Sequence, residues 1–296
     1  MVLFKSALHI AWINLCRWKK DYRIWLVFLF SSMLIVNYLK PYILYCTSEG
    51  KRITPCMLPL LFVQSDISLG SPKVYWFLGC LLLLCDAPFL HETASYMILR
   101  GGRKGWYLGE VLYIFMTSFF YMTFLTIVSA AVSIPVIEWG NDWGSGIMDY
   151  VFGNESFLSE EIWAMFPRHI PAPELTIMYL YPIAVEIYTY LTGLGCMFLL
   201  GLMVYLFSLV TRKEGLPIAL GGILVLIDPL LTFWAGIGRP WWQYFSPISW
   251  TSTDNLRILD MKHALSVEFV AAAELSLIAL LLLLIAWKMR RMEVSG

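Results

Sequence analysis

Long hydrophobic runs separated by short polar segments dominate the pattern of this chain. A helix needs about 20 predominantly apolar residues to cross the hydrocarbon core of a membrane. Six runs reach or approach that length, so we expect an all-α integral membrane fold with about six transmembrane helices. The runs cover residues 24–39, 74–90, 106–137, 175–210, 216–238 and 267–287.

The first 22 residues follow a different pattern. Apolar side chains recur at helical spacing, including Leu3, Leu8 and Leu15, and basic residues such as Lys19 and Lys20 accompany them. A basic amphipathic helix of this kind is typical of a segment that lies in the membrane interface. We therefore divide the chain into an interfacial helix, 1–22, and a transmembrane domain, 23–296.

A polar interruption at residues 91–105 separates the second and third hydrophobic runs. Residues 92–99 contain no Pro or Gly and can form two helical turns. The pair that follows, Gly101-Gly102, favours a break, because glycine costs a helix roughly 1 kcal/mol relative to alanine. We expect a short helix, a glycine corner and a basic start to the next span. A partner protein could bind this unit through residues Glu92, Arg100, Gly101, Gly102, Arg103 and Lys104.

Lys and Arg are more frequent in cytoplasmic loops than in outer loops. Placing both termini inside puts the larger share of these residues on the cytoplasmic side, so we expect an N-in, C-in topology. The 91–105 loop is then cytoplasmic, and the outer loops are 40–73, 138–174 and 239–266. The last outer loop is rich in aromatic residues and has prolines at its bends, which is typical of a re-entrant or interfacial segment.

Composition agrees with the membrane class. Of the 296 residues, 59% are hydrophobic and 14% are charged, whereas a soluble domain carries about 25% charged residues. The formal net charge is zero, and we expect no nucleic-acid partner. Cys46 and Cys56 share the first outer loop, where they could form a disulfide or remain free.

Motifs for catalysis are missing from the sequence. There is no GxxxxGK[ST] phosphate loop, no GxSxG or GxGxxG motif, and the segment beginning His91-Glu92 lacks the second histidine of HExxH. No Cys/His spacing matches a zinc site. We therefore expect no catalytic residue, metal or cofactor in this chain, and no enzymatic activity of its own.

Acidic residues within or near the hydrophobic runs leave two interpretations open. A charge at mid-membrane costs at least about 2.5–3.5 kcal/mol, so these acids could line a polar route for a substrate or proton. They could also cap helix breaks, since Asp86 and Asp228 each precede a proline. The candidate pathway residues are Asp86, Glu186 and Asp228, together with the aromatic outer residues Trp241, Trp242 and Trp250.

The order of these features resembles the membrane subunit of type-two ABC transporters, a family of small six-span bacterial exporters. The resemblance rests on three elements: the interfacial helix 1–22, the acidic-started helix and basic glycine corner from Glu92 to Lys104, and the serine-proline-aromatic segment 245–250. A glycine pair stands here where that family often has a proline. The loop of type-one importers matches less well, because Gly101 falls nine residues after Glu92.

The resemblance implies a permease in a cell membrane, of bacterial type. A separate ATP-binding cassette ATPase would hold ATP and Mg²⁺ and would seat the Glu92 helix. A second permease chain, identical or related, would complete the pathway through the lipid bilayer. The substrate implied is an antimicrobial, bacteriocin-like peptide or a lipid. Two alternatives stay open: a polytopic membrane enzyme that uses the intramembrane acids, and a non-transporting immunity or sensor protein.

Overall fold

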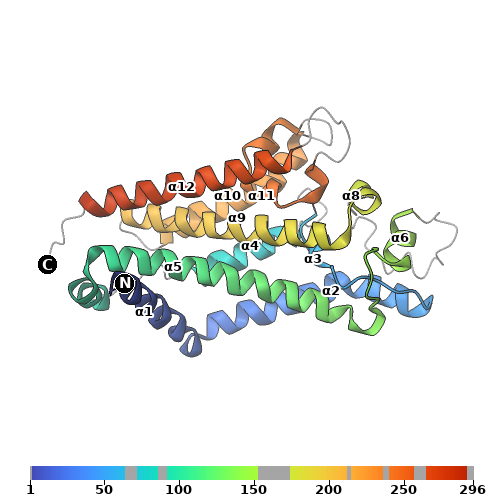
Figure 1. Cartoon of the computed structure of the whole chain (residues 1–296), viewed down its shortest axis with the longest axis horizontal. Coiled ribbons are helices and arrows are strands. Elements are labelled where there is room, and N and C mark those ends of the chain that lie inside the picture. Colours follow the sequence, from blue (N-terminus) through green and yellow to red (C-terminus); the bar gives the residue numbers. More distant parts are fainter. Residues whose placement is uncertain are drawn as a thin grey trace.

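Long helices run along the main axis of the molecule in the computed structural model (Figure 1). The structure describes residues 2–63, 72–85, 92–152, 174–211, 215–235, 240–256 and 265–291. Within these ranges the regular elements are all helical, and the extended contacts are two isolated bridges, Ile53 to Ile137 and Leu256 to Leu265. The expectation of an all-α chain is confirmed.

Five of the helices in the described ranges are long and apolar enough to cross a membrane. This gives the chain the character of a multi-pass membrane protein, as expected from the hydrophobic runs. The spanning segments are α2 (Tyr22–Ser48), the Gly102–Val132 part of α5 (Glu92–Val132), α9 (Pro182–Thr211), α10 (Gly215–Ala235) and α12 (Val267–Arg291).

The second expected span is only partly visible. α4 (Pro72–Leu83) has 12 residues, and a helix of that length covers about 18 Å, which is less than the hydrocarbon core. The rest of the run, residues 86–90, lies outside the described ranges. A sixth span therefore stays a prediction.

Two expected boundaries differ from the structure. α2 continues through Pro41 to Ser48, so the first nine residues of the expected outer loop 40–73 are helical. Tyr42, Tyr45 and Cys46 are buried in this extension, and that packing stabilises helix which the hydropathy alone does not indicate. The run 175–210 is divided into α8 (Glu174–Tyr179) and α9, which begins at a proline as helices often do.

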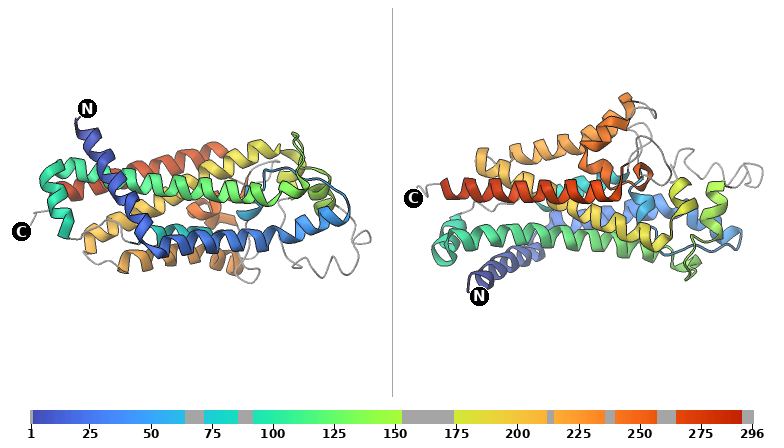
Figure 2. Two further views of the ribbon diagram at one scale, coloured as in Figure 1. Left: turned by 90° about the horizontal axis from the view of Figure 1, so that it is seen from below. Right: turned by 45° about the horizontal axis from the view of Figure 1, so that its top comes forward.

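The amino-terminal helix α1 (Val2–Arg17) is followed by the short helix η1 (Trp18–Lys20) and a sharp elbow into α2. Asp21 caps α2 by accepting a hydrogen bond from the Arg23 amide at 3.0 Å. α1 crosses the first part of α5 (Figure 2), and its buried face includes Ala7 and Ile10. The expected helix is present, and its location at a membrane surface stays a prediction.

The two ends of the bundle differ (Figures 1 and 2). The start of α1, the end of α12 and the first turns of α5 lie at one end, which we call the termini end. At the opposite end, the loop end, lie the short helices α3 (Leu58–Leu61), α6 (Ser145–Phe152), α8 and α11 (Pro247–Trp250). An N-in, C-in topology requires this arrangement.

At the loop end, the segment after α2 is joined through its backbone to the segment after α5. The Ile53 amide donates to the Val136 carbonyl at 2.9 Å, and the Ile53 carbonyl accepts from the Glu138 amide at 2.8 Å. The Arg52 carbonyl accepts from the Gly146 amide at 3.0 Å. Gly144 has φ +83° and lies against the Arg52 backbone, where a Cβ atom would collide. We call this joint the outer clasp.

Candidate functional site

A corner in α5 stands at the termini end. Gly102 has φ 71° and ψ 159°, while the residues on either side continue as helix. Only glycine readily adopts this backbone conformation. The first turns, 92–101, therefore leave the axis of the long span (Figure 1), which confirms the expected helix and glycine corner. Gly101 itself is still helical.

The basic residues after the corner are accessible. Arg103 and Lys104 are exposed at the termini end, as a partner-binding surface requires. The side chains of Glu92 and Arg100 lie outside the described part of the chain, although their backbone belongs to α5. Their role in coupling stays a prediction.

α1 is attached to the part of α5 that follows the corner. The Asn14 amide donates to Glu110 at 3.1 Å, and both side chains are buried. The Trp18 indole donates to the Tyr113 hydroxyl at 3.2 Å. At Gly109 an added Cβ would lie 2.8 Å from the Ile10 side chain, so the helices meet closely because that position is glycine. These contacts pack α1 against the part of α5 that begins seven residues after Gly102.

Near the loop end, a buried ion pair joins α4 to α10. The Lys73 ammonium lies 2.8 Å from the Asp228 carboxylate, and neither side chain is exposed. Lys73 also donates to the Ser252 hydroxyl at 3.1 Å, which in turn donates to the Phe62 carbonyl at 2.6 Å. Charges in the membrane require such partners.

The same carboxylate holds the segment around α11. The Ser246 hydroxyl donates to Asp228 at 2.7 Å, and the Ser249 hydroxyl donates to the same oxygen. Ser246 also caps α11 through the Ser249 amide. Asp228 thus fastens the serine-proline segment to α10. The alternative expectation, that Asp228 caps a helix break, is wrong, because α10 continues through Pro229 to Ala235.

We call Lys73, Asp228, Ser246, Ser249 and Ser252 the polar junction. The Lys73–Ser252 spacing is that of a lysine-activated serine nucleophile. However, the lysine acts as a donor to both the serine and the carboxylate, and the serine proton is directed at a backbone carbonyl. In these contacts the Ser252 proton points away from the lysine, so the geometry supports a structural fastening.

Sequence reasoning missed Lys73, which it placed in the outer loop 40–73. The available signal was the acid at position 228, because an intramembrane carboxylate predicts a nearby cation. Which cation it was could not be deduced, since the fold brings α4 and α10 together across the long helices between them.

The remaining candidate pathway residues each make their own contacts. Glu186 accepts a hydrogen bond from the Leu58 amide at 3.2 Å, so it caps α3. Trp250 is buried and donates to the Gln243 carbonyl at 2.9 Å. Trp242 is also buried, whereas Trp241 is 65% exposed. Asp86 lies outside the described ranges, and a shared route through these residues stays a prediction.

In the part of the chain that is described, no group of three or more His, Cys, Asp or Glu side chains could hold a metal ion. The six cysteines, Cys46 and Cys56 among them, are free thiols in the structure. No protein-family model, curated protein or solved structure matches this chain.

Proposed function

We propose that this chain is the permease subunit of an ATP-driven exporter of the type-two ABC class. A separate ATPase subunit would bind ATP and Mg²⁺ and engage the first turns of α5. The observation that carries the proposal is the glycine corner at Gly102, because it presents a short helix at the same end as both chain termini.

The geometry of α5 suits the transfer of mechanical work. Beyond the corner, the Gly102–Val132 segment is a helix of 31 residues, which spans about 46 Å. A displacement at its start therefore acts along a rigid element that ends at the outer clasp. α1 would follow through the Asn14–Glu110 hydrogen bond, so an ATPase acting on the corner would move two helices.

The pathway itself would be formed with a second permease chain. We propose an amphipathic peptide or a lipid as the substrate class, because the loop end carries exposed aromatic residues. Trp241 is 65% exposed and Phe245 is 80% exposed, which is unusual for a loop that faces only water. Such side chains suit the apolar part of an amphipathic molecule.

The test is affinity purification of the full chain from its native membranes after chemical crosslinking, followed by mass identification of the captured chains. We expect an ATP-binding cassette subunit with the native sequence and its loss with Arg103→Glu/Lys104→Glu. The control is Lys288→Glu/Arg290→Glu, which changes basic residues at the same end on α12. Equal capture by both variants, or no ATPase in any sample, contradicts the proposal.

A further inference from the structure

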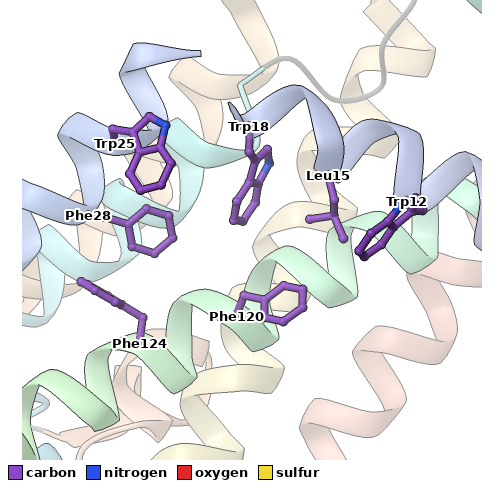
Figure 3. Close-up of a pocket in the computed structure, with 7 residues that line it drawn as sticks. All are labelled: Trp12, Leu15, Trp18, Trp25, Phe28, Phe120 and Phe124. Carbon is purple, nitrogen blue, oxygen red and sulfur yellow. The ribbon is translucent and has the colours of Figure 1, made fainter. Parts of the chain in front are cut away.

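An aromatic groove lies beside the elbow between α1 and α2. It has a volume of about 460 Å³ and is lined by three tryptophans, three phenylalanines and Leu15. Figure 3 shows that these side chains come from α1 and η1, from α2 and from α5, and that Leu15 and Trp18 point toward Phe120. The volume falls within the range of small-molecule sites, about 300–1,000 Å³.

The floor of the groove is fixed by contacts between rings. The Phe28 ring centroid lies 4.7 Å from that of Phe124, edge to face, and 5.9 Å from that of Trp18. The one polar atom of the Trp18 ring is already engaged, since its indole N–H donates to Tyr113. The groove therefore offers a preformed apolar surface.

The rim of the groove is open to the surroundings of the bundle. Trp12 is 60% exposed and Trp25 is 63% exposed, although both indoles are large apolar groups. These rings lie next to helices that are long and apolar enough to cross a membrane, where an apolar medium would suit them better than water. Tryptophan at such a site is typical of the membrane interface.

Two basic residues adjoin the groove residue Trp18 along the chain. Lys19 and Lys20 directly follow Trp18 in η1 and are exposed, and neither forms an ion pair with a described residue. The acid that follows them in the sequence, Asp21, forms an ion pair with Arg23 at 2.8 Å. The positive charges of Lys19 and Lys20 are therefore not neutralised by a described acid, next to the groove residue Trp18.

We propose that this groove binds one anionic glycerophospholipid, with an acyl chain between α1, α2 and α5 and the phosphate group at Lys19 and Lys20. The spatial order matches that of a lipid, because the lysines precede Tyr22 and the apolar floor at Phe28 lies about 9 Å further along α2. Basic residues attract anionic headgroups at a membrane surface. The site does not depend on an ATPase partner.

The site can be tested with the purified full chain in vesicles of dioleoyl phosphatidylcholine. Brominated phosphatidylglycerol is added in one series and brominated phosphatidylcholine in the other, and the quenching of tryptophan fluorescence is recorded. We expect stronger quenching by the anionic lipid. Lys19→Gln/Lys20→Gln should lower that preference by at least about fivefold, the scale expected for one lysine near an anionic surface.

Two pairs of variants locate the lipid. Trp18→Phe should weaken the anion-selective part of the quenching, with Trp12 and Trp25 reporting the remainder, whereas Trp287→Phe, which removes a 52% exposed tryptophan on α12, should leave it unchanged. Lys288→Gln/Arg290→Gln should likewise leave the preference unchanged. Equal quenching by the two lipids overturns the proposal, as does an anionic preference that survives unchanged in Lys19→Gln/Lys20→Gln. The Trp25→Cys variant tests the other possible occupant. If it formed disulfide-linked dimers while neither lipid quenched the tryptophan fluorescence, the groove would instead bind a second copy of the chain.

Discussion

The Lys73 ammonium and the Asp228 carboxylate lie 2.8 Å apart, with both side chains fully buried. Lys73 stands at the start of α4 and Asp228 in α10, so the pair joins two helices that are distant in sequence. Through the serines of the polar junction it also fixes the α11 segment. The pair therefore organises the loop end of the bundle.

We predict that breaking this pair destabilises the chain strongly. Lys73→Met or Asp228→Asn leaves a buried group without its partner, which costs about 3–5 kcal/mol. The double change Lys73→Met/Asp228→Leu should recover a large part of that loss, since two apolar side chains leave no charge uncompensated. Thermal unfolding of the purified chain in detergent measures the effect.

The matched control is Lys51→Met. Lys51 pairs with Asp149 at 2.6 Å, but both side chains are partly exposed, and such pairs contribute less than about 1 kcal/mol. If Lys51→Met lowered the unfolding temperature as much as Lys73→Met, burial of the Lys73 pair would not be the cause.

A second prediction concerns the attachment of α1. Asn14→Leu removes the donor to Glu110, whose other oxygen has no hydrogen-bond partner among the described residues. A buried polar group that loses its partner costs about 1–3 kcal/mol. Amide hydrogen exchange along α1 should become faster, while His9→Leu, an exposed position on the same helix, should leave it unchanged. Slow exchange in both variants would refute the role of Asn14.

The corner gives a third prediction. A Cβ atom at Gly102 would meet no other atom within 4 Å, so Gly102→Ala acts only through its backbone conformation. We expect a loss of about 1–3 kcal/mol. Gly222→Ala is the control, because that position also has open space but is helical, and alanine there should be neutral or stabilising by up to about 1 kcal/mol. Similar unfolding temperatures for the two variants would mean that the corner is not strained.

A fourth prediction uses the cysteines. Burial raises the pKa of the Cys56 thiol, so less of it is thiolate at neutral pH, and the thiolate is the reactive form. Cys16 is exposed. With N-ethylmaleimide at neutral pH, mass spectrometry should find Cys16 modified first, and the Cys56 rate should keep rising as the pH passes the ordinary thiol value near 8.5. Modification of Cys56 faster than of Cys16 at neutral pH would contradict its partly buried environment.

The sequence alone predicts the position of those spans whose apolar residues form one continuous run. α10 and α12 begin within a residue of the predicted starts, because a run of that length has no other stable location than a membrane. The glycine corner was also predictable. Which of the two glycines breaks the helix was not, since either can adopt a positive φ angle.

Features that depend on tertiary contacts could not be predicted. The extension of α2 past Pro41 rests on the burial of Tyr42 and Tyr45. The local sequence does not indicate which residues pack against these two side chains. The capping role of Glu186 depends on the distant Leu58 amide. For the same reason, the contact of Asp228 with the distant Ser246 hydroxyl could not be predicted.

The outer clasp has a mechanical consequence for α2 and α5. Its backbone hydrogen bonds tie the loop-end termini of the two helices through Ile53, Val136 and Glu138, and breaking several of them at once is costly. If α2 and α5 separated elsewhere along their length, they would pivot about that joint. The displacement of α2 in such a motion would grow with distance from the joint and would be largest at the elbow, beside the aromatic groove.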